Sequence, residues 1–407
     1  MIVKDEKMKS LLYNKNIILG VCGGIAAYKS VELLRLLAKQ GADPRVIMTS
    51  HACEFVGPMT FEALSGRPVC TNLFDKRNPD ASIRHIEWAQ EARAVIIAPA
   101  TANMIAKYAN GIADDALSTL LLAVTSPVII CPSMNTDMYL SPPVQRNLET
   151  LKKDGHMVLE PGAGELACGT VGPGRLPEPV QILDRVMACL TPKDLTDKKI
   201  LVTAGPTREP IDPVRFISNP SSGKMGYAIA RAAEYRGAEV TLIAGPVSLP
   251  DPLNINMVKV QTADQMADAV YENMEKADII IKTAAVSDYR PRQAAPHKIK
   301  KGDENIIMEL VKNQDILKTI GQRKTNQFLV GFAAETQDLR ENALKKLEAK
   351  NLDIIAGNLV CRPGSGFGTD TNRISLFYRD GTLEVLEQME KDTAAHIILD
   401  RVVERII

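Results

Sequence analysis

The sequence is poor in aromatic residues and has no excess of charge of either sign. Aromatic residues make up 4% of the 407 residues, and there is one tryptophan. Few stacking side chains are therefore available for single-stranded nucleic acid. The 49 Lys and Arg residues balance the 49 Asp and Glu residues, so charge does not point to nucleic acid or to an anionic membrane either. We predict neither as a partner.

The sequence also lacks a disulfide framework and a long apolar run. Its seven cysteines are irregularly spaced, and several lie within apolar stretches; this pattern is typical of a reducing cytosol. No apolar run reaches the length of a transmembrane helix, and the N-terminal MIVKDEKMKS is too charged for a signal peptide. We expect a cytoplasmic protein of two domains, 1–190 and 191–407, that meet at the polar segment 191–199.

The segment 161–177, PGAGELACGTVGPGRLP, has five glycines, three prolines and no hydrophobic period. This composition predicts a long loop, and long loops in compact domains are often lids. Cys168 lies at its centre. Two interpretations are open: an incidental thiol on a surface loop, or a reactive thiol that a flap carries over a bound ligand.

The first half contains four β-rich runs that are followed by small residues. Residues 16–21 form the first run, and Cys-Gly-Gly and a helical pattern over 25–40 follow it; this is a strand–turn–helix unit of a doubly wound α/β sheet. Its glycines suit a phosphate at a helix start, but GxGxxG is absent, so a mononucleotide is favoured over a dinucleotide. Small polar residues follow the next three runs, at Thr49, Ser50, Thr101, Asn103 and Asn135. They predict a ligand site at the carboxyl edge of the sheet, although helix capping would also explain them.

The second half restarts an α/β pattern at residues 200–204. The loop 208–226 contains Ser-Ser-Gly-Lys directly before a helical run, which suits an anion. It lacks GxxxxGK[ST], so a plain capped turn is the alternative. Asp288 follows the buried run 279–281 and could accept a hydrogen bond from a base amino group, or simply stabilise a turn.

Basic residues form two further groups in this half. Residues 297–301, HKIKK, include Lys298, and Lys346 and Lys350 fall on one face of a helix predicted over 339–350. Such clusters are most often solvated surface. Beside a nucleotide crevice they would neutralise a triphosphate. A glycine-rich loop, 362–371, and an amphipathic helix, 387–407, are predicted beyond them.

Three motifs together resemble the flavin-dependent cysteine decarboxylases. They are PSMNTDMY (132–139), the flap GELACGTVGPGR (164–175) and His85, three residues before Trp88. With the ligase-like signature 208–226, the chain resembles the bacterial bifunctional phosphopantothenoylcysteine decarboxylase/phosphopantothenate–cysteine ligase family. The resemblance implies an α/β fold, with a flavodoxin-like (Rossmann-type) FMN-binding decarboxylase domain followed by a Rossmann-like ligase domain. It implies an FMN site formed by Gly23, Gly24, Ile25, Ser50, Ala100, Thr101 and Asn103.

The same resemblance assigns the decarboxylation chemistry to His85, Asn135 and Cys168. A flavin can take two electrons from the thiol-bearing carbon and so create a sink for those that CO₂ leaves behind. A thiol with a pKa of about 8.5 is mostly protonated near neutrality, so Cys168 can return a proton. Asn135 can bind the substrate carboxylate without adding a charge, and His85 would act as a base or orient the substrate.

For the ligase, the resemblance implies that Asn219 serves the acyl-nucleotide intermediate, that Arg215 places the substrate and that Lys298 is essential. The substrates would be 4′-phosphopantothenate, cysteine and CTP, with Mg²⁺ beside the triphosphate, and the protein would be a homo-oligomer. The implied CTP contacts are Asp288, Lys298, Gln314, Asp315, Ile316, Leu317, Phe332, Lys346 and Lys350.

Three other functions deserve comparison. A flavin-dependent peptidyl-cysteine decarboxylase would not need the second domain. A non-catalytic regulatory homologue would lack one of His85, Asn135 and Cys168, all of which are present. A redox flavodoxin would not need the cysteine flap.

Overall fold

The computed structural model describes residues 10–73, 81–166, 169–301, 305–335, 337–359 and 368–406. These residues form two compact units, and the boundary between them along the chain falls between Thr191 and Pro192. Within the described ranges, no helix has both the length and the apolar character needed to cross a bilayer.

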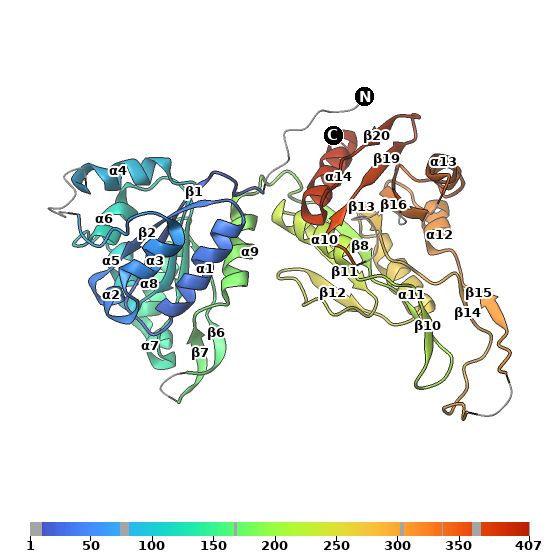
Figure 1. Cartoon of the computed structure of the whole chain (residues 1–407), viewed down its shortest axis with the longest axis horizontal. Helices are drawn as coiled ribbons and strands as arrows, with labels where there is room; N and C mark the ends of the chain where they lie inside the picture. Colours follow the sequence, from blue (N-terminus) through green and yellow to red (C-terminus); the bar gives the residue numbers. More distant parts are fainter. Residues whose placement is uncertain are drawn as a thin grey trace. The chain divides into compact units, whose positions relative to one another are not determined.

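The first unit is built on a five-stranded parallel sheet with strand order β2-β1-β3-β4-β5 (Figure 1). This order is that of flavodoxin-like folds, in which the ligand crevice opens at the carboxyl ends of the strands between β1 and β3. The prediction of this fold is confirmed. The strands are β1 (Asn16–Val21), β2 (Asp43–Met48), β3 (Ala94–Ala100), β4 (Val128–Pro132) and β5 (Met157–Val158).

Helices cover both faces of this sheet, which explains why its central strands are continuous apolar runs. In β1, Ile17 and Leu19 pack with α1, α3 and α9 on one face, whereas Ile18 packs with α4, α5, α6 and α8 on the other. The helices are α1 (Ala27–Lys39), α2 (Ser50–Phe55), α3 (Pro58–Ser65), α4 (Ala81–Glu91), α5 (Ala102–Ala109), α6 (Ala116–Ala123), α7 (Thr136–Leu140), α8 (Pro142–Lys153) and α9 (Pro179–Leu190).

The prediction that residues 161–177 form an irregular loop is wrong. The segment is an antiparallel hairpin of β6 (Gly162–Glu165) and β7 (Val171–Arg175), which lies beside α7 (Figure 1). Gly164 and Gly174 have φ values of +149° and +147°, which side-chain-bearing residues rarely adopt. The ladder is thus made by backbone that only glycine tolerates, and no alternation of side chains announces it.

The second unit has an eight-stranded sheet with order β12-β11-β8-β13-β16-β17-β19-β20. Its first six strands are parallel, and in chain order they read 3-2-1-4-5-6, the Rossmann order. The topological switch point lies between β8 and β13. The strands are β8 (Lys199–Ala204), β11 (Glu239–Ala244), β12 (Asn256–Lys259), β13 (Ile279–Lys282), β16 (Phe328–Glu335), β17 (Ile354–Leu359), β19 (Ile374–Tyr378) and β20 (Leu383–Val385).

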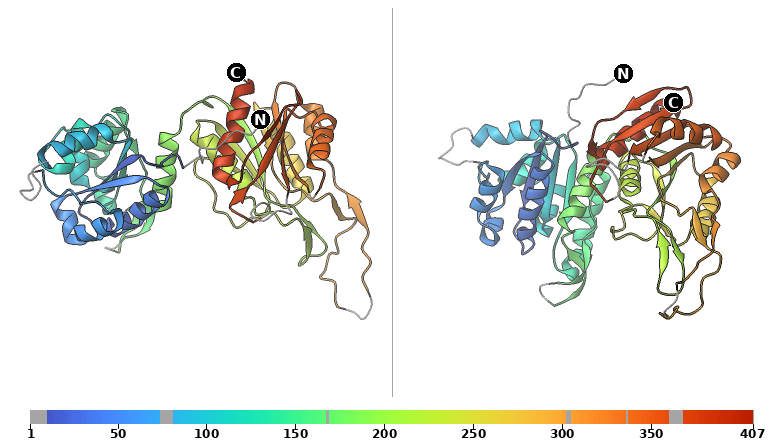
Figure 2. Two further views of the ribbon diagram at one scale, coloured as in Figure 1. Left: turned by 45° about the horizontal axis from the view of Figure 1, so that its top comes forward. Right: turned by 45° about the vertical axis from the view of Figure 1, so that its right-hand side comes forward.

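Helices again cover both faces of the sheet: α10 and α14 pack on one, and α11, α12 and α13 on the other. The ribbon of β14 (Tyr289–Pro291) and β15 (Leu310–Lys312) projects from this unit (Figure 2). The predicted tail helix begins later than expected, at Lys391, after a short strand; the predicted loop 362–371 lies largely outside the described residues. The remaining elements are α10 (Lys224–Tyr235), α11 (Ala263–Met274), α12 (Ile316–Arg323), α13 (Leu339–Ala349), α14 (Lys391–Ile406), β9 (Arg208–Pro210), β10 (Phe216–Ser218), β18 (Thr371–Asn372) and β21 (Met389–Glu390).

Candidate active sites

The turn after β1 leaves open space at the carboxyl edge of the first sheet. A Cβ atom on Gly23 would lie 2.3 Å from the Cβ atom of His51, so only glycine fits against the start of α2 there. At Gly24, by contrast, an added Cβ would meet no heavy atom within 4 Å. The next side chain, Ile25, is 64% exposed. The turn therefore offers bare backbone and an apolar side chain to a ligand.

The polar residues of this edge divide into capping residues and residues that are available for binding. Thr49 caps α2 and Thr101 caps α5; each hydroxyl accepts a backbone N–H bond at the helix start. The structure thus shows the capping role of Thr101, and its contact with FMN stays a prediction. Ser50 and Asn103 are exposed, and neither side chain hydrogen-bonds to any residue that the structure describes. Buried Ala100 ends β3 beneath them.

Asn135 follows β4 and is oriented by the helix that it caps. Its Oδ1 accepts hydrogen bonds from the backbone N–H groups of Asp137 (2.8 Å) and Met138 (3.4 Å) at the start of α7. Its Nδ2 donates toward the hydroxyl of Thr170, 3.5 Å away in the flap hairpin. Because the acceptor end serves the helix, the NH₂ group is the end turned to the flap, and it is the end that a carboxylate requires.

The flap is joined to the Asn135 loop at its base. The backbone N–H of Met134 donates to the carbonyl of Gly174 (3.0 Å), and a Cβ on Gly174 would lie 2.2 Å from the carbonyl oxygen of Met134. Cys168, which falls between β6 and β7 in the sequence, lies outside the described residues. His85 lies in α4, but its side chain is likewise outside the description. Thus the structure brings the flap to Asn135 and leaves the placement of the other two chemical groups a prediction.

In the second unit, Asn219 is turned to the carboxyl end of β13. Its Nδ2 donates to the backbone carbonyls of Ala285 and Val286, both at 3.1 Å. These carbonyls belong to the loop that follows the switch-point strand. The predicted residue therefore lies at the crevice where Rossmann folds bind ligands.

A buried carboxylate joins two predicted ligase segments. The Oδ2 atom of Asp212 accepts hydrogen bonds from the Nε and Nη2 atoms of Arg215 and from the backbone N–H of Ile299, whose carbonyl accepts from Arg215 (3.0 Å). The bonds from Arg215 hold the pKa of Asp212 well below its usual value. Lys298, next to Ile299, is exposed. The structure thus brings Arg215 and the Lys298 segment together.

The remaining predicted CTP residues divide by side-chain environment. Ile316 and Leu317 are core residues, 2% and 5% exposed, so only their backbone at the start of α12 can face a ligand. Asp315 caps α12 and forms an ion pair with Lys350 (2.8 Å). Lys346 forms an ion pair with Glu335 at 2.6 Å, and the Oε1 atom of Gln314 accepts a hydrogen bond from the hydroxyl of Tyr271. The side chain of Asp288 is exposed.

The Ser-Ser-Gly-Lys turn lines a pocket together with Phe332. Gly205 and Thr283, which follow β8 and β13, also line it, and so do Lys391 and Lys224, the latter in an ion pair with Asp370 at 2.6 Å. The start of α10 also faces it, which favours an anion. Lys391 was not identified from the sequence, because it begins a helix about 170 residues away from the turn in the chain.

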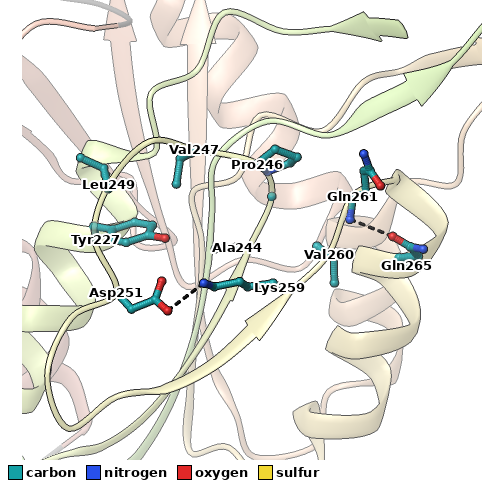
Figure 3. Close-up of a pocket in the computed structure, with 11 residues that line it drawn as sticks. Tyr227, Ala244, Pro246, Val247, Leu249, Asp251, Lys259, Val260, Gln261 and Gln265 are labelled. Atoms are coloured by element: carbon teal, nitrogen blue, oxygen red, sulfur yellow. Dashed lines mark hydrogen bonds and ion pairs between the residues drawn. The ribbon is translucent and has the colours of Figure 1, made fainter. Parts of the chain in front are cut away.

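A second pocket in this unit was also not anticipated. It lies beyond β11 and β12, and a 2.7 Å ion pair between Lys259 and Asp251 lies beside the ring of Tyr227 there (Figure 3). Val247 borders it and also lies against Gly205 and Gly223, which line the pocket of the Ser-Ser-Gly-Lys turn. The two pockets are thus neighbours. No motif marks this one, because its residues come from four separate elements.

Metal-ligating side chains are not gathered anywhere in the described part of the chain, where no group of three or more His, Cys, Asp or Glu residues could hold an ion. A divalent cation at either site would depend mainly on oxygens from a substrate and from water, as Mg²⁺ with nucleotides usually does.

Family models match both units. One described as "Flavoprotein" matches residues 5–191, and one described as "DNA/pantothenate metabolism flavoprotein C-terminal domain" matches residues 195–406. Among solved structures, the C-terminal domain of a coenzyme A biosynthesis bifunctional protein CoaBC is 42% identical, covering 53% of this chain and 98% of its own (TM-score 0.46). The FMN-dependent cysteine decarboxylase SpaF is 32% identical, covering 44% of this chain and 97% of its own (TM-score 0.38).

Curated relatives match almost the whole chain. The coenzyme A biosynthesis bifunctional protein CoaBC of Bacillus subtilis is 50% identical over 396 residues, which are 96% of this chain and 97% of the relative. The protein of the same name from Escherichia coli K12 is 47% identical over 400 residues, 97% and 98% of the two chains. The resemblance found in the sequence is thereby confirmed: the chain belongs to the family of coenzyme A biosynthesis bifunctional proteins CoaBC.

Proposed function

We propose that this chain joins cysteine to 4′-phosphopantothenate in its second unit and decarboxylates the product, 4′-phospho-N-pantothenoylcysteine, to 4′-phosphopantetheine in its first. The family membership supports both activities. The observation that carries the proposal is the pairing, in one chain, of a flavodoxin-type edge under a cysteine-bearing flap with a Rossmann-type edge lined by cations.

In the first unit, FMN would lie against Gly23, Gly24 and Ile25 and near Ser50 and Asn103, where the carboxyl edge is open. When bound, it would supply a two-electron acceptor and donor for the cysteinyl carbon. The Nδ2 group of Asn135 would donate to the substrate carboxylate. A neutral donor suits this role, because a cation would hold the carboxylate in its charged ground state.

The flap completes this site. Closing the hairpin would exclude water from the substrate, and Cys168 would deliver a proton to the ene-thiol carbon after CO₂ has left. His85 would orient the substrate or accept its thiol proton. These roles follow from the resemblance and from the flap's attachment beside Asn135.

In the second unit, the carboxylate of 4′-phosphopantothenate would attack the α-phosphate of CTP and release pyrophosphate. The amine of cysteine would then displace CMP from the acyl-cytidylate. Asn219 would serve the acyl-cytidylate intermediate, Arg215 would help to place the substrate, and Lys298 would balance charge that develops on the leaving group. Mg²⁺ would bind through the triphosphate oxygens.

The exposed apolar side chains favour a homo-oligomer. In the first unit, large apolar side chains of the turn before α1 and of α1, α2, α3 and α7 are at least half exposed. Where exposed apolar side chains form a continuous surface, they usually mark an interface, and a second copy of the chain would cover them. These side chains are Ile25, Tyr28, Phe55, Met59, Met138 and Leu140. A cytoplasmic location would fit the reduced cysteines.

The test is a spectrum followed by two assays on the full-length protein. The purified protein, loaded with FMN if needed, should show flavin absorbance and should release pyrophosphate with CTP, 4′-phosphopantothenate and cysteine. Pyrophosphate release with ATP but not with CTP would contradict the nucleotide assignment. Failure to take up FMN would contradict the assignment of the first unit as a flavin-dependent decarboxylase. In Cys168→Ser, an oxidised ene-thiol product should accumulate while ligation continues. Normal phosphopantetheine output would contradict the proton-donor role.

A further inference from the structure

Lys282 is the last residue of β13 and lies at the topological switch point of the second sheet. It pairs with Thr203 of β8 on one side and with Gly331 of β16 on the other. Ligands of doubly wound sheets bind outside the carboxyl ends of the strands at this point. Lys282 therefore lies at the edge of the sheet where a bound substrate is expected.

The surroundings of Lys282 include two other lysines, both of which are neutralised. Ile280, two residues earlier in the strand, packs in the core under α12 and α13, so Lys282 is on the same face. Lys346 on α13 pairs with Glu335 at 2.6 Å, and Lys350 at the end of α13 pairs with Asp315 at 2.8 Å. Their positive charges are thus already balanced by carboxylates.

Lys282 itself has no such balance. Its Nζ donates to the backbone carbonyl of Ala284 (3.1 Å), and no carboxylate of the described residues lies within ion-pair distance of it. Asp315 is engaged with Lys350, and Asp288, the other acid whose charge Lys282 feels, is exposed. A half-buried ammonium group without a carboxylate partner is costly, and the cost is offset when an anion binds.

We propose that the ammonium group of Lys282 binds a phosphate oxygen of a substrate at the carboxyl edge of the second unit, in addition to the residues that family resemblance implies. Two substrates of the proposed ligase carry that chemistry: the triphosphate of CTP and the phosphate of 4′-phosphopantothenate. The inference rests on the proposed function, and the experiment separates the two phosphate sources.

The protonation of Lys282 gives the proposal a second readout. Burial is the largest cause that lowers the pKa of Lys282, which falls to about 8. Repulsion from Lys350 and, more weakly, from Lys346 lowers this pKa further, whereas attraction to Asp315 and Asp288 opposes the shift. In the free enzyme the group thus loses its proton between neutral and mildly alkaline pH. Its contribution to phosphate binding should be largest near neutral pH and should fade as the pH rises through about 8, and bound phosphate should favour the protonated form.

The experiment compares Lys282→Met, Lys282→Arg and a matched control, Lys276→Met, in full-length protein by pyrophosphate release at pH 7 to 9.5. Lys276 is exposed and precedes β13 at the opposite edge of the sheet. We expect Lys282→Met to raise KM about tenfold or more for one phosphorylated substrate, the loss expected for one charge-assisted hydrogen bond, with a smaller change in kcat. A rise in KM for CTP would identify its triphosphate as the group that Lys282 binds, and a rise in KM for 4′-phosphopantothenate would identify the phosphate of that substrate. Lys276→Met should leave kcat and the KM values of both phosphorylated substrates unchanged.

The pH series and stability complete the test. In the wild type, kcat/KM for the affected substrate should fall above pH 8, and in Lys282→Arg it should stay level, because arginine keeps its charge. The thermal midpoint of Lys282→Met should equal or exceed that of the wild type, since an unbalanced charge has been removed. Unchanged KM values, or a lowered midpoint with unchanged KM values, would overturn the proposal. If Lys282→Met fails to fold, a wild-type profile flat from pH 7 to 9.5 would overturn it instead. Absence of CTP-dependent pyrophosphate release in the wild type would overturn the proposed function itself.

Discussion

The contact between the flap and the Asn135 loop predicts a large and selective effect for Gly174→Ala. A Cβ at this position would lie 2.2 Å from the carbonyl oxygen of Met134, whereas carbon and oxygen normally approach to about 3.3 Å. The two backbones would have to separate by roughly 1 Å, given that normal separation. The 3.0 Å hydrogen bond from the Met134 N–H to the Gly174 carbonyl would then be lost.

The magnitude follows from two contributions. The lost hydrogen bond is worth about 1 kcal/mol, and alanine at φ +147° adds about 1–3 kcal/mol of backbone strain. A penalty of about 2–4 kcal/mol at the base of the hairpin should displace the flap from Asn135. We expect decarboxylation of 4′-phospho-N-pantothenoylcysteine to slow at least about tenfold. Ligation, carried by the other unit, should change less than twofold.

Gly155→Ala is the matched control. Gly155 also has a positive φ, +90°, but a Cβ there would meet no heavy atom within 4 Å, and it precedes β5 at the opposite edge of the sheet. Both reactions are followed in each variant, one by phosphopantetheine formation and the other by pyrophosphate release. Undiminished decarboxylation in Gly174→Ala, or an equal loss in Gly155→Ala, would refute the proposed role of the contact between the flap and the Asn135 loop.

Three further substitutions test other parts of the molecule. Asn135→Asp keeps the oxygen that caps α7 but replaces the NH₂ donor by a negative charge; decarboxylation should fall more than about tenfold, and wild-type rates would rule out the carboxylate-binding role. In Asp212→Asn, an NH₂ group would face the Arg215 guanidinium and the N–H of Ile299; pyrophosphate release should fall while decarboxylation continues, and an equal loss of both would show general unfolding. Arg236→Met would break pairs with Asp194 and Asp400 at a 4% exposed site, costing about 2 kcal/mol because both acids can rehydrate. The midpoint of the second unit in calorimetry should drop by about 4–8 °C, and an unchanged midpoint would contradict this.

The sequence predicted the parts of the fold that depend on local patterns. The strands at 16–21, 94–98 and 128–131 and the helix at 339–350 appear within a few residues of their predicted bounds, because buried parallel strands and amphipathic helices carry their own hydrophobic signal. The flap hairpin was missed because its ladder is formed by glycine backbone. The strand β7, VGPGR, has one proline and two glycines among its five residues, and such a composition resembles a loop in any pattern-based prediction.

From the sequence, the positions of candidate site residues could be predicted only where these residues lie within one short motif. Asn135 and the glycine turns could be placed at the carboxyl edges of their sheets because strand ends in a parallel sheet converge. The environment of Lys282 could not, because Asp315 and Lys350, which define it, follow 33 and 68 residues later in the chain. That a lysine lacks a carboxylate partner is a property of the folded structure, and no spacing in the sequence records it.

The reaction stoichiometry of the full-length protein tests the central claim most directly. With FMN bound and with CTP, 4′-phosphopantothenate and cysteine supplied, mass spectrometry and gas detection should find one CMP, one pyrophosphate and one CO₂ for each 4′-phosphopantetheine. Carbon dioxide released from cysteine without nucleotide consumption, or nucleotide consumption without any carbon dioxide even in the presence of FMN, would contradict the account.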